Sequence, residues 1–475
     1  MGNGSSPFVT VEVEMPEKFD LLIIGGSLAG LLGAVLAKSR NPHWSVALVE
    51  KEDVLGGNLV GADALDDHFE LGTHLLQETG VAEIDRLLRE SVDPTQLLAL
   101  DSQVGDRVGT IRGGRIFENT GYPAVLEQDQ TLARVILDEI IQITGRHEAP
   151  ITSISNLRST PLMEAAIQWF GESAWSSVIR PIISAKFGST DSLTGFVLEL
   201  ANLSRLQIAS EEIWQRNSHI DGFRARVAFP QQLQLPEIFR HNRKTLYSRE
   251  YGNRDFISGL MESCTSLGVS LMSSCAIVNL DPNARSVTLS RDGKMAEFRY
   301  KRAISCLGVS ATARLLGRSA EVEQRRIPLH LVHLVLNKPM PSSVCYFYDH
   351  DPESSIFRVT NYAAFSGRSD DKRLTVELFN VADQDTNLII ESVKNSETLS
   401  SLLSQTCEVV SAVCSKPLSL AVPNTQNIND LLAQERFLSS QSAGALAVCG
   451  VGTSGFRFFQ SETVRDITAL IMEMT

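Results

Sequence analysis

Apolar residues dominate the first regular stretch of the sequence, and their spacing changes at a glycine pair. Residues 19–25, FDLLIIG, form a short continuous apolar run that predicts a buried strand. Beyond the Gly25–Ser27 turn, residues 28–39, LAGLLGAVLAKS, predict a helix, and residues 45–51, SVALVEK, predict a second strand. The order of strand, glycine turn, helix and strand predicts a βαβ unit.

Farther along the chain, helical and strand-like patterns alternate. Residues 83–246 are mostly helical in pattern, most clearly at 161–188. Residues 253–268 predict an amphipathic helix, and residues 461–475 predict a last one. Strands are predicted at 269–281, 286–293, 302–308 and 445–450, and as an antiparallel set within 327–380.

The order of these segments predicts an α/β fold with two domains, because 475 residues are too many for one compact core. A Rossmann-like nucleotide-binding domain would be built from discontinuous segments, and a mixed antiparallel sheet with helices would form a substrate-binding domain over it. The expected boundaries place 18–82, 247–312 and 440–475 in the first domain, 83–246 and 313–439 in the second, and 1–17 in a flexible tail.

The glycine turn has the features of a dinucleotide site. In such a site the first glycine permits the tight turn, the second lets the backbone approach the pyrophosphate, and the third lets the helix pack on the strand. Gly25, Ser27 and Gly30 hold these positions, and the helix N-terminus behind them favours an anion. Glu50, at the end of the next strand, is placed to bind the ribose hydroxyls. The alternative is a structural glycine turn in an ordinary α/β protein.

Composition and charge argue against several other classes. The formal net charge is −13, from 43 Lys and Arg against 56 Asp and Glu, and no basic stripe is present, so nucleic acid is not an expected partner. The glycine turn divides the apolar run 21–37 into a strand and a helix, neither long enough to span a bilayer. The seven cysteines form no CxxC pair and no signal-peptide pattern is seen, so reduced thiols and a cytoplasmic location are expected. No metal-ligand spacing is evident, and no metal site is expected.

Three segments together resemble a known family. IIGGSLAGL, VALVEKEDVLGGN and FELGTHLL are similar to the opening of the FAD-dependent superfamily that includes amine oxidases, protoporphyrinogen oxidase, carotenoid desaturases and UDP-galactopyranose mutase. The family usually has Arg after its second glycine pair, whereas Asn58 here is similar to the GGN of the mutases. The resemblance implies that FAD is the cofactor of the first domain.

Later segments follow the same family order. Residues 164–194 resemble the helical stretch of protoporphyrinogen oxidases, and residues 300–316 resemble the strand that returns to the flavin domain. Ile277 takes the place of a family residue that contacts adenine. Residues 445–466 resemble the C-terminal flavin-binding strand, loop and helix, but Val451 replaces the acidic residue that the family typically has after its glycine.

The resemblance implies a cofactor-binding set and two candidate catalytic residues. Glu70, Gly72 and His74 fall where the family has an acidic or polar residue, a glycine and often a histidine close to the flavin. His74 is a candidate catalytic residue, and Arg358 is a candidate ligand for an anionic substrate group; the alternatives are a buried histidine bonded to backbone and an exposed strand arginine. The predicted cofactor-binding residues are Gly25, Gly26, Ser27, Leu28, Ala29, Gly30, Glu50, Lys51, Gly56, Gly57, Asn58, Gly72, Thr73, His74, Ile277, Gly450, Gly452 and Gly455.

The expected function is an FAD-dependent oxidoreductase of the amine oxidase or protoporphyrinogen oxidase type, which takes hydride from a small organic substrate to flavin N5. One alternative is a non-redox sugar-nucleotide mutase similar to UDP-galactopyranose mutase. Its candidate diphosphate ligands are Arg180, Arg249, Arg358 and Tyr362. A flavin monooxygenase and a flavin-less scaffold are further alternatives.

Cys449 bears on how FAD is held, and the aromatic residues bear on where a substrate would bind. Cys449 lies in the apolar strand ALAVCG, so non-covalent FAD is expected. Aromatic residues at 169–196 and 346–357 would either line an apolar pocket or belong to the core, and core is favoured. The substrate, the electron acceptor and the oligomeric state stay open.

Overall fold

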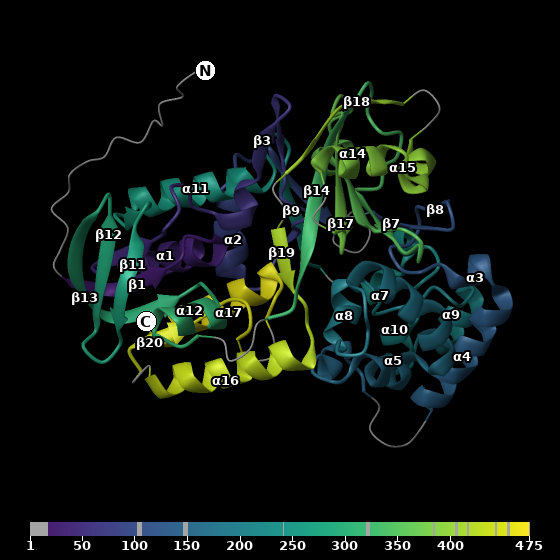
Figure 1. Cartoon of the computed structure of the whole chain (residues 1–475), viewed down its shortest axis with the longest axis horizontal. Helices are drawn as coiled ribbons and strands as arrows, with labels where there is room; N and C mark the ends of the chain where they lie inside the picture. The colour runs from purple at the N-terminus through teal and green to yellow at the C-terminus, as the bar shows by residue number, and fades with distance from the viewer. Residues whose placement is uncertain are drawn as a thin grey trace.

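The fold is taken from a computed structural model of the chain. It describes residues 18–101, 107–145, 151–240, 242–319, 324–382, 385–403, 407–415, 418–441, 444–453 and 457–474. The predicted tail, 1–17, lies outside the described residues. Two mixed sheets and a helical part make up most of the structure (Figure 1).

The first sheet contains the predicted βαβ unit. Strand β1 (Lys18–Ile24) leads through the glycine turn into α1 (Leu28–Arg40) and back to β2 (Val46–Val49), which pairs with β1 in parallel. The remaining strands of this sheet are β10 (Ser270–Met272), β11 (Ala276–Asp281), β12 (Ser286–Arg291), β13 (Lys294–Ser305) and β20 (Leu446–Val448). Both ends of the chain therefore contribute to one sheet, as Figure 1 shows.

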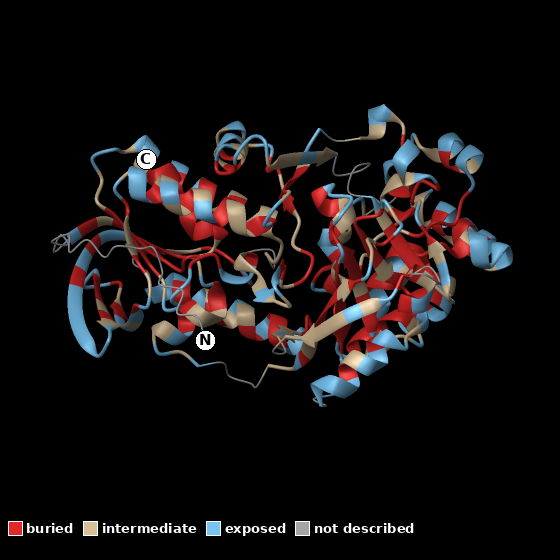
Figure 2. Cartoon of the chain, turned by 90° about the horizontal axis from the view of Figure 1, so that it is seen from above, coloured by how far each residue is buried: buried red, intermediate tan, exposed pale blue. Residues whose placement is uncertain are grey.

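The carboxyl ends of five parallel strands point the same way. The parallel order is β10-β2-β1-β13-β20, and β11 and β12 form an antiparallel extension on the first half of β13. Helix α1 packs against α11 (Asn253–Ser266) and α17 (Gln460–Met474). Figure 2 shows the buried strands of this sheet between helices with exposed outer faces. The glycine turn therefore lies at the sheet edge where α/β proteins bind ligands.

The second sheet is mostly antiparallel and has eight strands. Its path is β18-β14-β17-β16-β15-β7-β8, and β19 pairs with β14. The strands are β7 (Val108–Arg112), β8 (Arg115–Phe117), β14 (Arg326–Leu336), β15 (Tyr346–Asp349), β16 (Ile356–Asn361), β17 (Arg373–Phe379), β18 (Val409–Cys414) and β19 (Leu418–Ala421). Side chains alternate between the faces of a strand. Leu374, Val376 and Leu378 face the cluster under α14 (Thr386–Lys394) and α15 (Glu397–Leu402), and the intervening residues of β17 face the other way.

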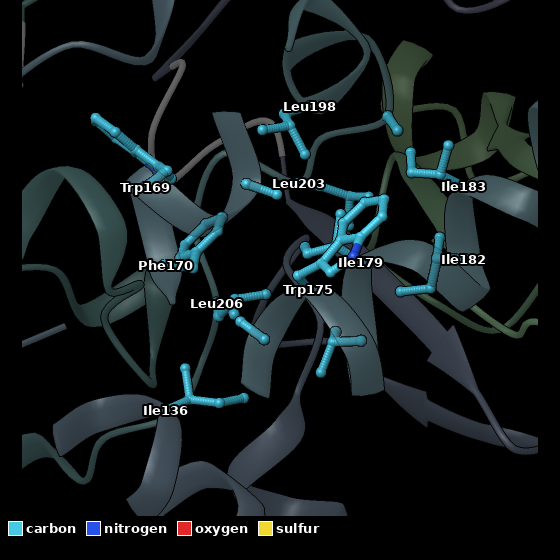
Figure 3. Packing of buried hydrophobic residues seen from close by; sticks show 14 of the residues in the cluster. Ile136, Trp169, Phe170, Trp175, Ile179, Ile182, Ile183, Leu198, Leu203 and Leu206 are labelled. Atoms are coloured by element: carbon cyan, nitrogen blue, oxygen red, sulfur yellow. The ribbon is translucent and has the colours of Figure 1, made fainter. Parts of the chain in front are cut away.

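The helical part supplies the largest apolar core. It includes α4 (Gln130–Thr144), α5 (Leu162–Phe170), α7 (Arg180–Phe187), α9 (Glu211–Asn217) and α10 (Asp221–Arg226). Figure 3 shows Trp169, Phe170 and Trp175 among the aliphatic side chains of this core. Phe187 and Phe357 belong to the same cluster. Most of the aromatic residues that were weighed as pocket lining are therefore core, as favoured from the sequence.

The helical expectation for 83–246 needs a correction. Strands β6 (Leu97–Asp101), β7, β8 and β9 (Lys244–Ser248) interrupt this region. Strand β7 pairs with β15, far away in the sequence, and β6 pairs with β9. A short segment whose partners are so distant carries little local signal, so its strand conformation depends on tertiary pairing.

The helices of the described part of the chain were compared with the requirements for crossing a membrane. No helix found there combines the length and the apolar character that crossing a bilayer requires.

Candidate cofactor and substrate site

The glycine turn after β1 is as tight as the sequence predicts. Gly25 has φ +103° and donates its N–H to the Val49 carbonyl at 2.8 Å. A Cβ atom on Gly30 would lie 2.1 Å from the Gly25 carbonyl oxygen. Only glycine fits at position 30 while α1 packs this closely on the turn.

The start of α1 offers donors to an anion. Ser27 is the N-cap with extended backbone, and its side chain makes no capping hydrogen bond. Within the described residues, the N–H groups of Ser27 and Ala29 have no acceptor, and Ser27 is half-buried. Open N–H groups at a helix N-terminus and the helix dipole together favour a phosphate.

Glu50 lies at the carboxyl end of β2, directly beside the turn. Its Oε2 atom accepts the Gly26 N–H at 2.8 Å, and its Oε1 atom accepts the Glu52 N–H at 3.1 Å. The side chain is half-buried, whereas Lys51 is exposed and paired with Glu52. The structure therefore places a carboxylate beside the glycine turn, as the motif predicts.

The second glycine pair packs on the first. Gly56 has φ +112° and donates its N–H to the Gly26 carbonyl at 2.7 Å. A Cβ on Gly56 would lie 2.6 Å from Val60 Cγ2, whereas one on Gly57 would meet nothing within 4 Å. Gly56 thus fits the fold, while exposed Gly57 and Asn58 leave open space beside the turn.

The C-terminal loop reaches the same sheet edge. Gly308, just after β13, donates its N–H to the Cys449 carbonyl at 3.1 Å, and Val309 donates to the Val451 carbonyl at 3.0 Å. Gly450 has φ +109° and Gly452 has φ +86°. The predicted residue Gly455 lies outside the described residues. The loops after β1, β13 and β20 therefore meet at one edge.

Ile277 reaches this edge from a distant segment. It is a half-buried residue of β11. Cys275, two residues earlier, donates its N–H to the Glu50 carbonyl at 2.9 Å. Hydrogen bonding thus brings the start of β11 to the end of β2, where a ribose acid would lie.

The Gly72–His74 segment is bound to the second sheet. The Thr73 N–H donates to Glu377 Oε1 at 2.9 Å, and the Thr73 hydroxyl donates to the same oxygen at 3.0 Å. Thr73 Oγ1 also contacts Thr360 Oγ1. On its other side, the Asn253 side chain of α11 donates to the His74 carbonyl at 2.9 Å, so the segment links the second sheet to a helix that packs on the first.

The hydrogen bond of His74 selects one tautomer. Burial lowers the pKa of its imidazole, and Arg358 acts in the same direction, although the Glu377 carboxylate opposes them. Its Nε2 lies 3.0 Å from the Leu71 carbonyl, which only accepts, so Nε2 carries the hydrogen. Nδ1 is then left as an acceptor.

Arg358 is not the exposed strand arginine that was weighed as an alternative. Its side chain is 16% exposed, and it forms a bidentate pair with Glu377, from Nε to Oε1 at 2.8 Å and from Nη2 to Oε2 at 2.9 Å. Glu377 raises the pKa of the Arg358 guanidinium despite its burial. The guanidinium is therefore already engaged with a carboxylate of its own chain.

Three features of this site were not predicted from the sequence: Glu377, Asn253 and a second role for Tyr362. Glu70 accepts the N–H of Asn253 at 2.8 Å, and its own N–H donates to the Tyr362 hydroxyl at 2.9 Å. Burial raises the pKa of the Glu70 carboxyl to about 7, against the hydrogen bonds from Asn253. A signal for Glu377 was present: polar and apolar residues alternate in RLTVELF, a pattern usually assigned to a solvent-facing sheet.

A cavity of about 140 Å³ adjoins these residues. Its wall includes Leu75, which follows His74, and Tyr346, whose ring centre lies 6.0 Å from the Arg358 guanidinium carbon. The other lining residues are Gln77, Arg107, Val108, Glu118, Asn119, Gly121, Tyr122, Asn202, Gln232 and Leu233. Half of the lining residues carry an amide or a hydroxyl group, and Arg107 and Glu118 add a charge of each sign, so the cavity offers both donors and acceptors to a small polar molecule.

The remaining candidate diphosphate ligands do not form a cluster. Arg180 lies exposed on α7, and Arg249 donates to the Ser366 carbonyl at 3.1 Å. The Tyr362 hydroxyl is buried and pairs with Thr375 at 2.9 Å. Arg358 lies on β16 of the second sheet, whereas Tyr362 begins the helix after it and bonds to Thr375 of β17.

Comparison with known sequences supports the first domain. Residues 23–91 match a family model described as an NAD(P)-binding Rossmann-like domain. No curated protein matches the sequence of this chain.

Solved structures share the fold over almost the whole chain. Reduced UDP-galactopyranose mutase is similar with a TM-score of 0.69 and 15% identity, over 96% of this chain and 93% of that one. A protein of Exiguobacterium sp. 255-15, provisionally named protoporphyrinogen oxidase, has a TM-score of 0.64 and 14% identity, over 96% and 98%. Putrescine oxidase bound to putrescine has a TM-score of 0.59 and 15% identity, over 96% and 99%.

These identities are too low to transfer an activity, but the structural similarity covers both ends and the middle of the chain. The chain therefore shares the fold of these solved structures, and residues 23–91 match an NAD(P)-binding Rossmann-like domain.

Proposed function

We propose that the protein is an FAD-dependent oxidoreductase that oxidises a small polar substrate. The observation that carries this proposal is the glycine turn after β1. There a Cβ on Gly30 would lie 2.1 Å from the Gly25 carbonyl oxygen, and Glu50 accepts the Gly26 N–H at 2.8 Å. This combination of close helix packing, open N–H groups and an adjacent carboxylate is suited to a dinucleotide.

The residues present fit the ADP half of FAD. Residues 25–30, with Leu28 and Ala29 in the first turn of α1, would hold the pyrophosphate, and Glu50 would bind the ribose. The open space beside Gly57 leaves room for the cofactor, with Lys51 and Asn58 exposed at its rim. Ile277 would contact the adenine, and Gly450 and Gly452 would let the C-terminal loop approach the ribityl chain. Buried Cys449 supports a non-covalent cofactor.

The chain's own residues would prepare the reaction. Bound flavin supplies a hydride acceptor at N5. Gly72, Thr73 and His74 would face it, since this segment bonds both to Glu377 of the second sheet and to Asn253 of α11. The neutral His74 imidazole presents Nδ1 as an acceptor for a substrate hydrogen bond or proton. The cavity next to Leu75 would hold the substrate and restrict the access of water.

A flavin-dependent sugar-nucleotide mutase is the second candidate. The Asn58 of the GGN segment favours it, together with the similarity to UDP-galactopyranose mutase at a TM-score of 0.69. It requires cationic ligands for a diphosphate. The described contacts do not gather Arg180 and Arg249 with Arg358, so we rank the mutase below the oxidoreductase.

A visible spectrum of the purified and FAD-reconstituted protein tests the proposal. We expect flavin absorption bands that stay with the protein on gel filtration. Flavin bleaching by a candidate amine or other reduced substrate, with net electron transfer, would support an oxidoreductase. Turnover that needs prior reduction by dithionite and consumes no electrons would support the mutase, and NAD(P)H-dependent oxygen insertion would support a monooxygenase. Absence of bound flavin after reconstitution would leave only the scaffold.

A further inference from the structure

Glu377, on strand β17 of the second sheet, binds the Gly72–His74 segment, which follows the two glycine pairs of the first domain. Its side chain is 2% exposed, and both carboxylate oxygens are occupied. Oε1 accepts from the N–H and the hydroxyl of Thr73 at 2.9 and 3.0 Å, and also from Arg358 Nε at 2.8 Å. Oε2 accepts from Arg358 Nη2 at 2.9 Å. We refer to Thr73, Arg358 and Glu377 together as the Glu377 clamp.

The charges of the clamp compensate each other. Burial alone raises the pKa of the Glu377 carboxyl, but Arg358 and the Thr73 hydrogen bonds outweigh burial and hold it below its usual value. Arg358 also approaches the Tyr348 hydroxyl at 3.5 Å and packs 5.6 Å from the Phe357 ring centre. A fixed bidentate pair of this kind defines the position of the carboxylate.

The clamp acts on the backbone of the Gly72–His74 segment. A backbone N–H donor cannot move away by rotating a side chain, so Thr73 has a defined distance from the sheet as long as Glu377 is ionised. Gly72 lies so close that an added Cβ would be 3.6 Å from the carboxylate. The Arg358–Glu377 pair therefore determines how far this segment extends from the second sheet.

We propose that Glu377 is a positioning residue that places the backbone of residues 72–74 for the cofactor, and that Arg358 acts through Glu377 and not as a substrate ligand. This inference rests on the proposed function only in taking FAD to lie against residues 72–74. The link between Thr73 and Glu377 is a property of the chain with or without FAD.

Amide hydrogen exchange of the full-length protein without added FAD tests the link directly. We expect the Thr73 amide to exchange at least tenfold faster in Glu377→Gln than in the wild type, because an amide oxygen is a weaker acceptor than a carboxylate. Glu377→Asp should restore part of the protection. Unchanged Thr73 exchange in Glu377→Gln would overturn the proposal.

Asp349→Asn is the matched control. Asp349 is a buried acid of the same sheet, 1% exposed, and accepts from the Thr398 hydroxyl at 2.6 Å. Its variant should leave the Thr73 amide unchanged while altering exchange near Thr398. Faster Thr73 exchange in both variants would show general loosening of the sheet and contradict a specific clamp.

The FAD-loaded protein tests the consequence. We expect Glu377→Gln to bind FAD within about threefold of the wild-type affinity, but with a shifted flavin absorption band and a changed reduction potential. Thr73→Val should produce part of the same shift, and the double variant should show less than the sum of the two effects. Equal spectra and potentials in all variants would remove the positioning role. Failure of every variant and the wild type to bind FAD would refute the proposed function but leave the exchange result to decide the clamp.

Discussion

At position 30 a methyl group would have to occupy the space of a carbonyl oxygen. The Gly25 oxygen lies 2.1 Å from where that carbon would be, and Gly25 itself has φ +103°. The motif predicts a glycine here, and the packing explains why. At position 27 a side chain is tolerated: Ser27 is only half-buried, and its hydroxyl makes no capping hydrogen bond to the helix.

Gly30→Ala should therefore separate α1 from the turn. We expect FAD affinity to fall at least 100-fold and the free energy of unfolding to fall by roughly 1–3 kcal/mol. Cofactor titration and urea unfolding measure the two effects. Gly145→Ala is a suitable control, because the nearest atom to its added Cβ is the Ile141 carbonyl oxygen at 3.1 Å and its φ is −85°. Full FAD occupancy in Gly30→Ala would show that the third-glycine role is wrong.

The raised pKa of the buried Glu70 carboxyl predicts that the free energy of unfolding depends on pH. Burial raises the pKa of its carboxyl to about 7 from its usual value of 4.5, so the folded state binds the proton more tightly than the unfolded state. This contribution is fully present below pH 4.5 and is lost as pH rises to about 7. The loss is on the order of 3 kcal/mol by the linkage relation. The groups around Glu70 are Asn253 and Arg254 of α11, Tyr247 of β9, Tyr362 of α13 (Tyr362–Ser366) and Arg373 of β17.

Urea unfolding at pH 5, 6, 7 and 8 measures this dependence. The wild type should lose stability across this range, and Glu70→Gln should lose less, since its amide does not titrate. Parallel pH profiles for the two proteins would exclude Glu70 as the source.

At the level of elements, the N-terminus of α17 is held by a carboxylate of its own first turn. Glu462 Oε2 accepts the N–H groups of Phe458 and Phe459 at 2.9 and 3.1 Å, and Oε1 pairs with Arg158 at 3.0 Å. Arg158 also pairs with Glu199 at 2.7 Å and lies 4.8 Å from the Phe196 ring centre. The Glu462–Arg158 pair therefore joins α17, which packs on the first sheet, to the helical part.

Glu462→Ala should accordingly destabilise the protein by roughly 2 kcal/mol, because it removes a helix cap and one partner of a buried arginine. The exposed Glu473, near the end of the same helix, provides the control. Glu473→Ala should change the free energy of unfolding by less than about 0.5 kcal/mol. Equal losses in the two variants would mean that Glu462 contributes only general helix propensity.

Elements with strong local signals were predictable. The pattern predicted β1, α1, β2, α11, β12 and α17, and the structure confirms them. It did not predict β7 and β8. Strand β7 pairs with β15, more than 200 residues away in the sequence, since Tyr346 pairs with Val108, and β8 pairs with β7. Short strands of this kind depend on a sheet that is complete only in the folded chain.

At the scale of the whole molecule, the site lies where both ends and the middle of the chain meet. The loops after β1, β13 and β20 meet at one sheet edge, and Thr73 connects that part to the second sheet through Glu377. Binding of FAD should therefore stabilise more than the first domain, because the ligand would contact segments from both ends and the middle of the chain, and Thr73 links these segments to the second sheet.

Thermal unfolding with added FAD measures this effect. At a concentration about 100 times the Kd, FAD should contribute about 2.7 kcal/mol to the free energy of unfolding. Riboflavin lacks the pyrophosphate and the adenosine that the turn and Glu50 would bind, so it should stabilise far less. Equal stabilisation by riboflavin would contradict an ADP-binding role for the glycine turn.

The sequence alone determined the kind of fold and the position of the predicted dinucleotide turn. These depend on local order: apolar spacing distinguishes strand from helix, and the turn needs small residues at Gly25, Ser27 and Gly30 with an acid at the end of the next strand. Only the tertiary structure decided the surroundings of His74 and Arg358. Their partners, Leu71 for the first and Glu377 for the second, depend on which face of each strand is buried and on pairing between distant segments. The local sequence does not distinguish a polar strand residue that faces water from one that faces another part of the protein, because only the folded structure determines what covers that face of the strand.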